Sequence, residues 1–336
     1  MNNVYWEKWQ AGKWDLPVVP LEDERLNPFR DEGVEFHFLL GNHAPDETLK
    51  FAAVSGILKH AAKSGALEGK NEHAAATSGA FGRVAARVCP MPMFGASKVT
   101  LVMKEDVPEG KRRSAFFAGA TIVPPEEGLS TIATAQKMGQ RSNVFNLDQY
   151  TDYHVTDDYR EIVAPHVWGK LHPDVLVSPV GTGGTFIGLA DAFKNFSDGN
   201  TFVVGAMCAS GAKIPGMRDV EGMAEIRHPW QKKMDEAVEV GTEFAYLSAL
   251  WFQWGTGVAS GVSGGASLAA MTSFIVSHRA AGDLDRFRGS DGRIRILGIV
   301  HDGFMPYLDR FSTVLSSKNK NRRTAETPYE FLRRTV

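Results

Sequence analysis

The 336-residue chain contains only two cysteines, Cys89 and Cys208, which lie far apart and show no CxxC spacing. This scarcity argues against a disulfide framework and a cysteine-based zinc site, and it is typical of a reducing cytosol. The N-terminus lacks the continuous apolar stretch of a secretory signal. The longest apolar segment, 244–276, is interrupted by Gln253 and by glycines and serines. We therefore expect a cytoplasmic protein without a membrane span.

A strong charge of either sign is also missing, because the formal net charge is -2. This balance gives no electrostatic reason to expect nucleic acid or an anionic membrane as a partner. The basic stretch 317–336 is interpreted as a solvated tail or a last helix. His154, His166 and His172 lie close in sequence but have no carboxylate or cysteine at metal-ligand spacing, so we predict no metal site.

Strand-like and helix-like patterns alternate along the chain, of which 43% is apolar. Apolar residues at helical spacing predict a helix within 47–67, with Pro45, Asp46 and Glu47 as its start signals. Further helices are predicted within 110–120 and 186–196, and strands at 98–103, 121–123, 174–180, 201–207 and 294–300. This alternation is typical of parallel βαβ units, so an α/β architecture with two lobes is expected.

The stretch "GTGGTFIG", 181–188, places four glycines and two threonines between a predicted strand and a predicted helix. Backbone amides in such a turn can converge on an anion, and the helix N-terminus favours negative charge. The third glycine of a dinucleotide fingerprint is missing, since Phe186 stands there, and the Gly-Lys-Ser/Thr ending of an ATP-type P-loop is absent. A smaller phosphate monoester remains, with a tight turn needed only for packing as the alternative.

Two more small-residue turns precede helices, at 74–88 and 257–271. Three such turns suggest loops that converge on one polar, anionic ligand. The residues around Ser263 also match the letters of a G-x-S-x-G hydrolase motif, but they follow an alanine–serine turn and no evident strand. A hydrolase is therefore only a third interpretation.

The three turns, in this order, resemble the cysteine synthase and cystathionine β-synthase family of pyridoxal-phosphate enzymes. "VGTGGTFIGLADAFK" is similar to the family's phosphate loop, "ATSGAFG" to its substrate-carboxylate loop, and "GVSGGA" to the loop whose serine faces the pyridine nitrogen. "FNLDQY" and "GIVHDGFMPYLDRF" are similar to further family segments. The resemblance extends from about Pro45 to about Phe311 and implies a two-lobed, tryptophan synthase β-like (fold-type II) architecture.

The resemblance also implies a set of site residues. Lys50 falls at the position of the lysine that holds the cofactor as an imine and moves the α-proton; Lys59 and Lys63, on the same predicted helix, are interpreted as solvated. Pyridoxal 5'-phosphate would be bound by Lys50, Gly181, Thr182, Gly183, Gly184, Thr185 and Ser263. The substrate carboxylate would be bound by Thr77, Ser78, the Gly79 amide and Gln149.

The same resemblance implies a smaller, mobile N-terminal domain at 40–165 and a larger C-terminal domain, 1–39 plus 166–336, that carries the phosphate loop. It implies a homodimer and β-replacement on an O-acyl- or O-phosphoserine through an aminoacrylate. A thiol or other nucleophile would give cysteine or a cysteine-like amino acid. The alternatives are a β-elimination lyase and a pyridoxal-phosphate-binding pseudoenzyme or regulatory partner.

The chain departs from the family pattern at two places. Ala80 stands where the family has an asparagine that hydrogen-bonds the ring hydroxyl oxygen, and Phe81 replaces a threonine. The lost contact corresponds to about 1 kcal/mol. Asp46 and Glu47 stand where small polar residues are usual. These changes indicate a diverged relative, and the tryptophan-rich N-terminal segment matches nothing in the family.

Overall fold

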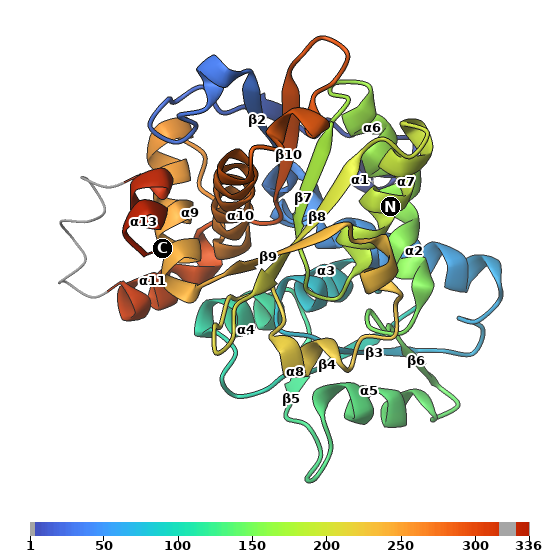
Figure 1. Ribbon diagram of the computed structural model, residues 1–336. Helices are drawn as coiled ribbons and strands as arrows, with labels where there is room; N and C mark the ends of the chain where they lie inside the picture. The colour runs from blue at the N-terminus through green and yellow to red at the C-terminus, as the bar shows by residue number, and fades with distance from the viewer. Residues whose placement is uncertain (1–3, 316–326, 336) are drawn as a thin grey trace.

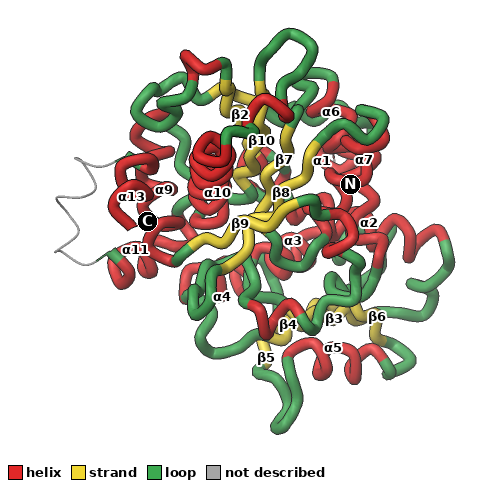
Figure 2. Tube along the Cα trace, viewed as in Figure 1, coloured by secondary structure: helices red, strands yellow, loops and turns green. Residues whose placement is uncertain are grey.

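The computed structural model describes residues 4–315 and 327–335. Two sheets lie one above the other, and helices cover both faces of each (Figure 1). Figure 2 shows their strands as two separate groups. The predicted α/β, two-lobed architecture with mostly parallel sheets is thereby confirmed.

The larger sheet has six strands in the order β1-β2-β10-β7-β8-β9, and all neighbours are parallel except β1 and β2. Its strands are β1 (Val18–Pro20), β2 (Val34–Leu40), β7 (Val175–Pro179), β8 (Phe202–Cys208), β9 (Glu236–Val240) and β10 (Ile294–Val300). The smaller sheet is parallel throughout, in the order β5-β4-β3-β6. Its strands are β3 (Glu72–Ala76), β4 (Lys98–Val102), β5 (Thr121–Val123) and β6 (Val144–Asn146).

The helices form layers on these sheets. They are α1 (Val4–Gln10), α2 (Lys50–Lys63), α3 (Ala80–Val88), α4 (Glu109–Phe117), α5 (Thr131–Gly139), α6 (Ala164–Trp168), α7 (Gly184–Phe196), α8 (Val220–Met223), α9 (Thr242–Thr256), α10 (Val262–Ala281), α11 (Leu308–Val314) and α13 (Pro328–Thr335). Within residues 4–315 and 327–335, no helix is both long enough and apolar enough to cross a bilayer.

Strand β7 shows how the core is divided. Val175 and Val177 belong to the hydrophobic cluster under α9 and α10, whereas Leu176 between them belongs to the cluster under α7. A strand whose successive side chains are all buried reads as a continuous apolar run, which is typical of a parallel sheet covered on both faces. This is why 174–180 could be predicted from sequence.

The predicted strands and helices are found within a few residues of their expected bounds, with two corrections. Helix α2 begins at Lys50, and its expected start signals Asp46 and Glu47 lie outside it, with φ angles of 59° and 56°. Helix α7 begins at Gly184, earlier than the expected Phe186. Strand β3 was missed because "EHAAA" is poor in β-forming residues, and pairing with both β4 and β6 decides its conformation.

The N-terminal segment crosses between the lobes. Strands β1 and β2 pair within the larger sheet, as the proposed 1–39 assignment requires. Helix α1 instead packs against the part proposed as the N-terminal domain, where the Trp6 ring lies 5.1 Å from Phe94 and the Trp9 ring 5.2 Å from Phe51. The division into domains at 40 and 166 stays a proposal.

At the other end of the chain, part of the predicted last helix is found as α13. Its Phe331 ring stacks on Phe244 at 4.8 Å. The remainder of the basic stretch, 317–326 and Val336, lies outside the described residues.

Candidate active site

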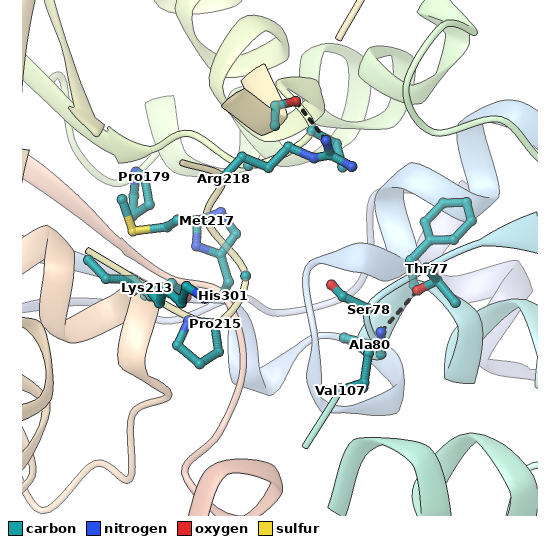
Figure 3. Close-up of a pocket in the computed structure, with 18 of the residues that line it drawn as sticks. Thr77, Ser78, Ala80, Val107, Pro179, Lys213, Pro215, Met217, Arg218 and His301 are labelled. Carbon is teal, nitrogen blue, oxygen red and sulfur yellow. Dashed lines mark hydrogen bonds between the residues drawn. The ribbon is translucent and has the colours of Figure 1, made fainter. Parts of the chain in front are cut away.

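A cavity of about 970 Å³ lies where the carboxyl ends of β3, β7 and β10 meet. Figure 3 shows Thr77, Ser78 and Val107 on one side, and Pro179, Met217 and His301 on the other. Ligands of open α/β sheets bind outside the carboxyl ends of parallel strands, because successive loops converge there. Every site residue predicted from the sequence lines this one cavity.

The turn 181–185 joins β7 to α7 and forms a cradle. Gly183 has a φ of 88°, which favours glycine, and a β-carbon on Gly181 would lie 2.3 Å from the Gly216 carbonyl oxygen. The Thr185 hydroxyl is buried and makes no hydrogen bond of good geometry, although the Tyr159 hydroxyl lies near enough to interact with it. A buried, poorly satisfied hydroxyl at a helix N-terminus is expected at a phosphate site, where the ligand would supply a better acceptor.

Lys50 is the first residue of α2 and points at this cradle. Its Nζ donates to Thr182 Oγ1 over 3.4 Å. Although the side chain borders the cavity, protein surrounds the ammonium group, and desolvation lowers the pKa of Lys50 to about 8. The Asp302 carboxylate opposes this shift and the Lys111 ammonium adds to it. A lysine with such a pKa supplies neutral amine near neutral pH, as a nucleophile requires.

The two alternative lysines on α2 lie elsewhere. Lys59 is 33% exposed and also forms an ion pair of 2.6 Å with the buried Asp158, so it is only partly solvated. Lys63 is exposed, as expected. Neither lines the cavity, which leaves Lys50 as the lysine of α2 that faces it.

The loop 77–79 follows β3 on the opposite side. Thr77 Oγ1 accepts hydrogen bonds from the amides of Gly79 (3.0 Å) and Gly82 (3.2 Å). The Gly79 amide, expected to bind the substrate carboxylate, is therefore already engaged and has to exchange partners. Ser78 is exposed to the cavity, and Gln149 uses one amide hydrogen on the Ala76 carbonyl at 2.9 Å, which leaves the second free to donate.

Ser263 lies in the first turn of α10 and is buried. A β-carbon on Gly216 would lie 3.9 Å from both Ser263 Oγ and Tyr307 Oη. Ser263 thus borders the cavity at the end where β10 leaves the sheet.

Sequence reasoning missed two buried charged residues of the cavity, Lys111 and Asp302. Lys111 lies in the helix predicted within 110–120, and Asp302 lies in the family-like segment "GIVHDGFMPYLDRF", but neither residue was given a role. Both are buried and line the cavity. Only a buried position separates such residues from surface charges, and one sequence does not reveal it.

The three histidines that lie close in sequence have separate contacts, and His154 Nδ1 lies 2.7 Å from Asp157 Oδ2. His166 contacts the backbone of Leu16, and His172 stacks on Trp168. Within residues 4–315 and 327–335, no group of three or more potential ligands could hold a metal ion.

Comparison with known proteins identifies the family. The family described as "Pyridoxal-phosphate dependent enzyme" matches residues 17–286. The chain belongs to this family.

Several relatives refine that assignment. A cysteine synthase of Haemophilus influenzae is 27% identical over 248 residues, which is 67% of this chain and 77% of the relative. Cysteine synthase A of Escherichia coli is 25% identical over 248 residues, which is 67% of this chain and 76% of the relative. The chain is therefore a diverged, cysteine synthase-like member of the family, with pyridoxal phosphate as its cofactor.

Solved structures agree in fold. A hydrogen sulfide-producing enzyme of Fusobacterium nucleatum superposes with a TM-score of 0.75 at 19% identity, covering 91% of this chain and 100% of that one. An O-ureido-L-serine synthase superposes with a TM-score of 0.75 at 17% sequence identity, covering 97% of this chain and 100% of that one. A cysteine synthase of Entamoeba histolytica superposes with a TM-score of 0.73 at 20% sequence identity, covering 93% of this chain and 91% of that one. All three support the fold-type II architecture.

The residues of this pyridoxal-phosphate enzyme fit its cofactor. The cradle 181–185 offers backbone amides and the hydroxyls of Thr182 and Thr185 to a phosphate, and the Thr185 hydroxyl makes no other hydrogen bond of good geometry. Lys50 brings an amine of lowered pKa to the same turn. The donor set and the amine thus match the two ends of one phosphorylated aldehyde.

Proposed function

We propose that the protein catalyses β-replacement on an activated L-serine, such as an O-acyl or O-phospho ester, and yields cysteine or a cysteine-like amino acid. The observation that supports this most is the common cavity. The Lys50 amine, the cradle 181–185 and the loop 77–79 come from three distant segments and line it together. That the protein is a homodimer, that it is cytoplasmic and that a thiol or other nucleophile is its second substrate stay predictions.

The residues would divide the work as follows. Bound pyridoxal phosphate supplies the electron sink that makes the α-proton acidic. Gly181, Gly183 and Gly184 hold the phosphate through their amides, and Thr182 and Thr185 add hydroxyls. Lys50 carries the cofactor and then takes and returns the α-proton.

Substrate orientation would depend on the opposite loop. Thr77 and Ser78 offer hydroxyls to the α-carboxylate, and Gln149 offers its free amide hydrogen. The Gly79 amide would also donate to the α-carboxylate once its hydrogen bond to Thr77 Oγ1 is broken. Such fixed donors lower the entropic cost of reaching the reactive geometry.

Ser263 presents a neutral hydroxyl at its end of the cavity. A neutral partner leaves a pyridine nitrogen less protonated than a carboxylate would, and so makes a weaker electron sink. That favours rapid loss of a β leaving group over transamination or racemisation.

A β-elimination lyase is the second candidate. It is supported by the fold shared with an enzyme described as hydrogen sulfide-producing. The replacement of the family asparagine by Ala80, which lines the cavity, also changes the surroundings of the ring. In this reaction water, and not a thiol, would consume the product of β-group loss, and a keto acid would form.

The test is product analysis of the cofactor-loaded protein with O-acetyl-L-serine, with and without sulfide. Cysteine that forms only with sulfide supports β-replacement, and pyruvate at equal rates in both supports elimination. Lys50→Ala should abolish either product, whereas Lys63→Ala, on the exposed side of the same helix, should not. Cofactor binding without product would support the pseudoenzyme, and no cofactor uptake would refute the proposed function.

A further inference from the structure

The cavity contains a second buried lysine, Lys111, which the proposed chemistry does not use. Lys111 stands in the first turn of α4 and is 4% exposed. It lines the cavity, and among the described residues it forms no ion pair or side-chain hydrogen bond. Its Nζ lies 4.3 Å from the centre of the Tyr307 ring, which is a cation–π contact. The three N–H donors of this ammonium therefore remain available to a ligand.

The carboxylate near Lys111 does not neutralise it by direct contact. Asp302 Oδ2 accepts a hydrogen bond of 2.6 Å from Tyr307 Oη. The negative charge of Asp302 still raises the pKa of both Lys50 and Lys111 without direct contact. Burial has the larger effect on Lys111 and lowers its pKa. In the cofactor-free protein, the Lys50 and Lys111 ammonium groups share the field of one carboxylate, Asp302. When Lys50 carries the cofactor, Lys111 still forms no ion pair with any of the described residues. A bound anion would offset the desolvation of Lys111.

The position of Lys111 places it beside the substrate. A β-carbon on Gly79 would lie 2.5 Å from Lys111 Cδ, so the lysine stem runs along the loop predicted to hold the α-carboxylate. That loop and Gln149 already provide neutral donors for the α-carboxylate. The ammonium is therefore left for a different group of the ligand.

The other cations of the cavity are less suited to this role. Lys104 and Lys213 are exposed. Arg218 forms an ion pair of 2.6 Å with Glu225, and Arg310 donates to the Asp106 carbonyl. Apart from Lys50, Lys111 is the lysine of this cavity that is withdrawn from water, and a withdrawn cation discriminates most strongly between charged and neutral ligands.

We propose that Lys111 is a specificity residue that binds a second anionic group, separate from the α-carboxylate, carried by the amino-acid substrate or by the nucleophile. The enzyme would thus act on an acidic donor or take an acidic acceptor. This inference rests on the proposed function.

The test compares ligands of equal shape and different charge. Binding of L-aspartate and L-asparagine, and of L-glutamate and L-glutamine, to the cofactor-loaded protein is measured by calorimetry; none of the four carries an activated leaving group. For the nucleophile, the KM for thioglycolate is compared with that for 2-mercaptoethanol, with O-acetyl-L-serine as donor. The variants are Lys111→Met, Lys111→Arg and, as a control, Lys104→Met at the exposed rim.

If the substrate carries the anion, the wild type should bind an acidic amino acid about tenfold more tightly than its amide, as expected for a charged hydrogen bond. If the nucleophile carries it, the tenfold preference should appear between the two thiols. In either case Lys111→Met should bring the ratio close to one, while Lys111→Arg and Lys104→Met keep it. Thermal unfolding of each variant checks that it is folded.

The proposal is overturned if neither pair shows a preference, if Lys111→Met leaves the preference intact, or if it weakens acidic and neutral ligands equally. The last result would assign Lys111 to the α-carboxylate or to structure. If the protein takes up no cofactor, the proposed function fails, and sulfate titration of the cofactor-free protein still tests the anion site. Loss of one bound sulfate in Lys111→Met then supports it, and unchanged binding refutes it.

Discussion

Lys50 Nζ and Thr182 Oγ1 lie 3.4 Å apart, although 132 residues separate them in the chain. The contact joins the first residue of α2 to the turn that follows β7. It therefore holds the amine proposed to react against the turn proposed to bind the phosphate before any ligand arrives. Preorganisation of this kind lowers the cost of binding and orienting a cofactor.

Replacing Thr185 by valine should weaken cofactor binding with little effect on the stability of the cofactor-free protein. The buried hydroxyl has only the Tyr159 hydroxyl beside it and makes no hydrogen bond of good geometry, so Thr185→Val removes a poorly satisfied polar group at nearly constant shape. We expect the free energy of unfolding of the cofactor-free protein to stay within about 1 kcal/mol of wild type or to rise. Cofactor affinity should fall about tenfold, as measured by fluorescence titration. A large loss of stability without cofactor would show that the hydroxyl has a structural role instead.

The pH dependence of cofactor attachment should report the charges around Lys50. Attachment needs the neutral amine, so its rate in wild type should rise with pH to a plateau, with a midpoint near the Lys50 pKa of about 8. Asp302 raises this pKa and Lys111 lowers it. Asp302→Asn should thus move the midpoint to lower pH, and Lys111→Met should move it to higher pH. Shifts in the same direction would contradict the assignment.

The same pKa predicts a stability effect in the cofactor-free protein. Folding lowers the Lys50 pKa from 10.5 to about 8, so between these values the unfolded chain binds more protons than the folded one. The contribution of Lys50 to the free energy of unfolding should therefore increase with pH across that window, by up to about 3 kcal/mol. Lys50→Met should remove this rise in urea titrations at successive pH values. An equal slope in both proteins would disprove it.

Gly183→Ala tests the cradle. At a φ of 88° an alanine is strained, and we expect a loss of about 1–2 kcal/mol in the free energy of unfolding. Cofactor affinity should fall further, because a shifted turn no longer directs its amides at one point. Gly199→Ala is the matched control: its φ is 86°, no atom lies near its missing β-carbon, and it does not line the cavity. Equal effects on cofactor affinity in both variants would refute the role of Gly183.

The turn before Lys50 should depend on an ion pair. Asp46, at a φ of 59°, lies 3.0 Å from Arg83 Nε and also pairs with Arg87. Burial raises the pKa of Asp46 and so offsets part of the ion pair. We therefore expect Asp46→Asn and Arg83→Gln each to lower the free energy of unfolding by only about 1 kcal/mol, since asparagine tolerates positive φ but loses the charge. A double-mutant cycle should give a coupling of about 1 kcal/mol. Additive losses would show that the pair is not coupled.

The sequence allowed much of the site to be predicted because its signals are local. The glycine turn 181–185 is contiguous, and the strand before it and helix after it have clear periodicities. Lys50 could be placed by its spacing from the other turns of the family pattern. By contrast, the sequence treated Asp46 as a helix start, and only packing against α3 shows that it pairs with Arg83.

By itself the sequence determined the α/β class and the glycine turn 181–185, because these depend on short-range patterns of apolar and small residues, and the family pattern indicated the lysine that faces the turn. The tertiary structure alone decided which charges are buried. Lys111, Asp302 and Tyr307 form one cluster only because α4 packs against the segment that follows β10. Burial changes the free energy of a charge by far more than its neighbours in sequence do, and burial is a property of the fold.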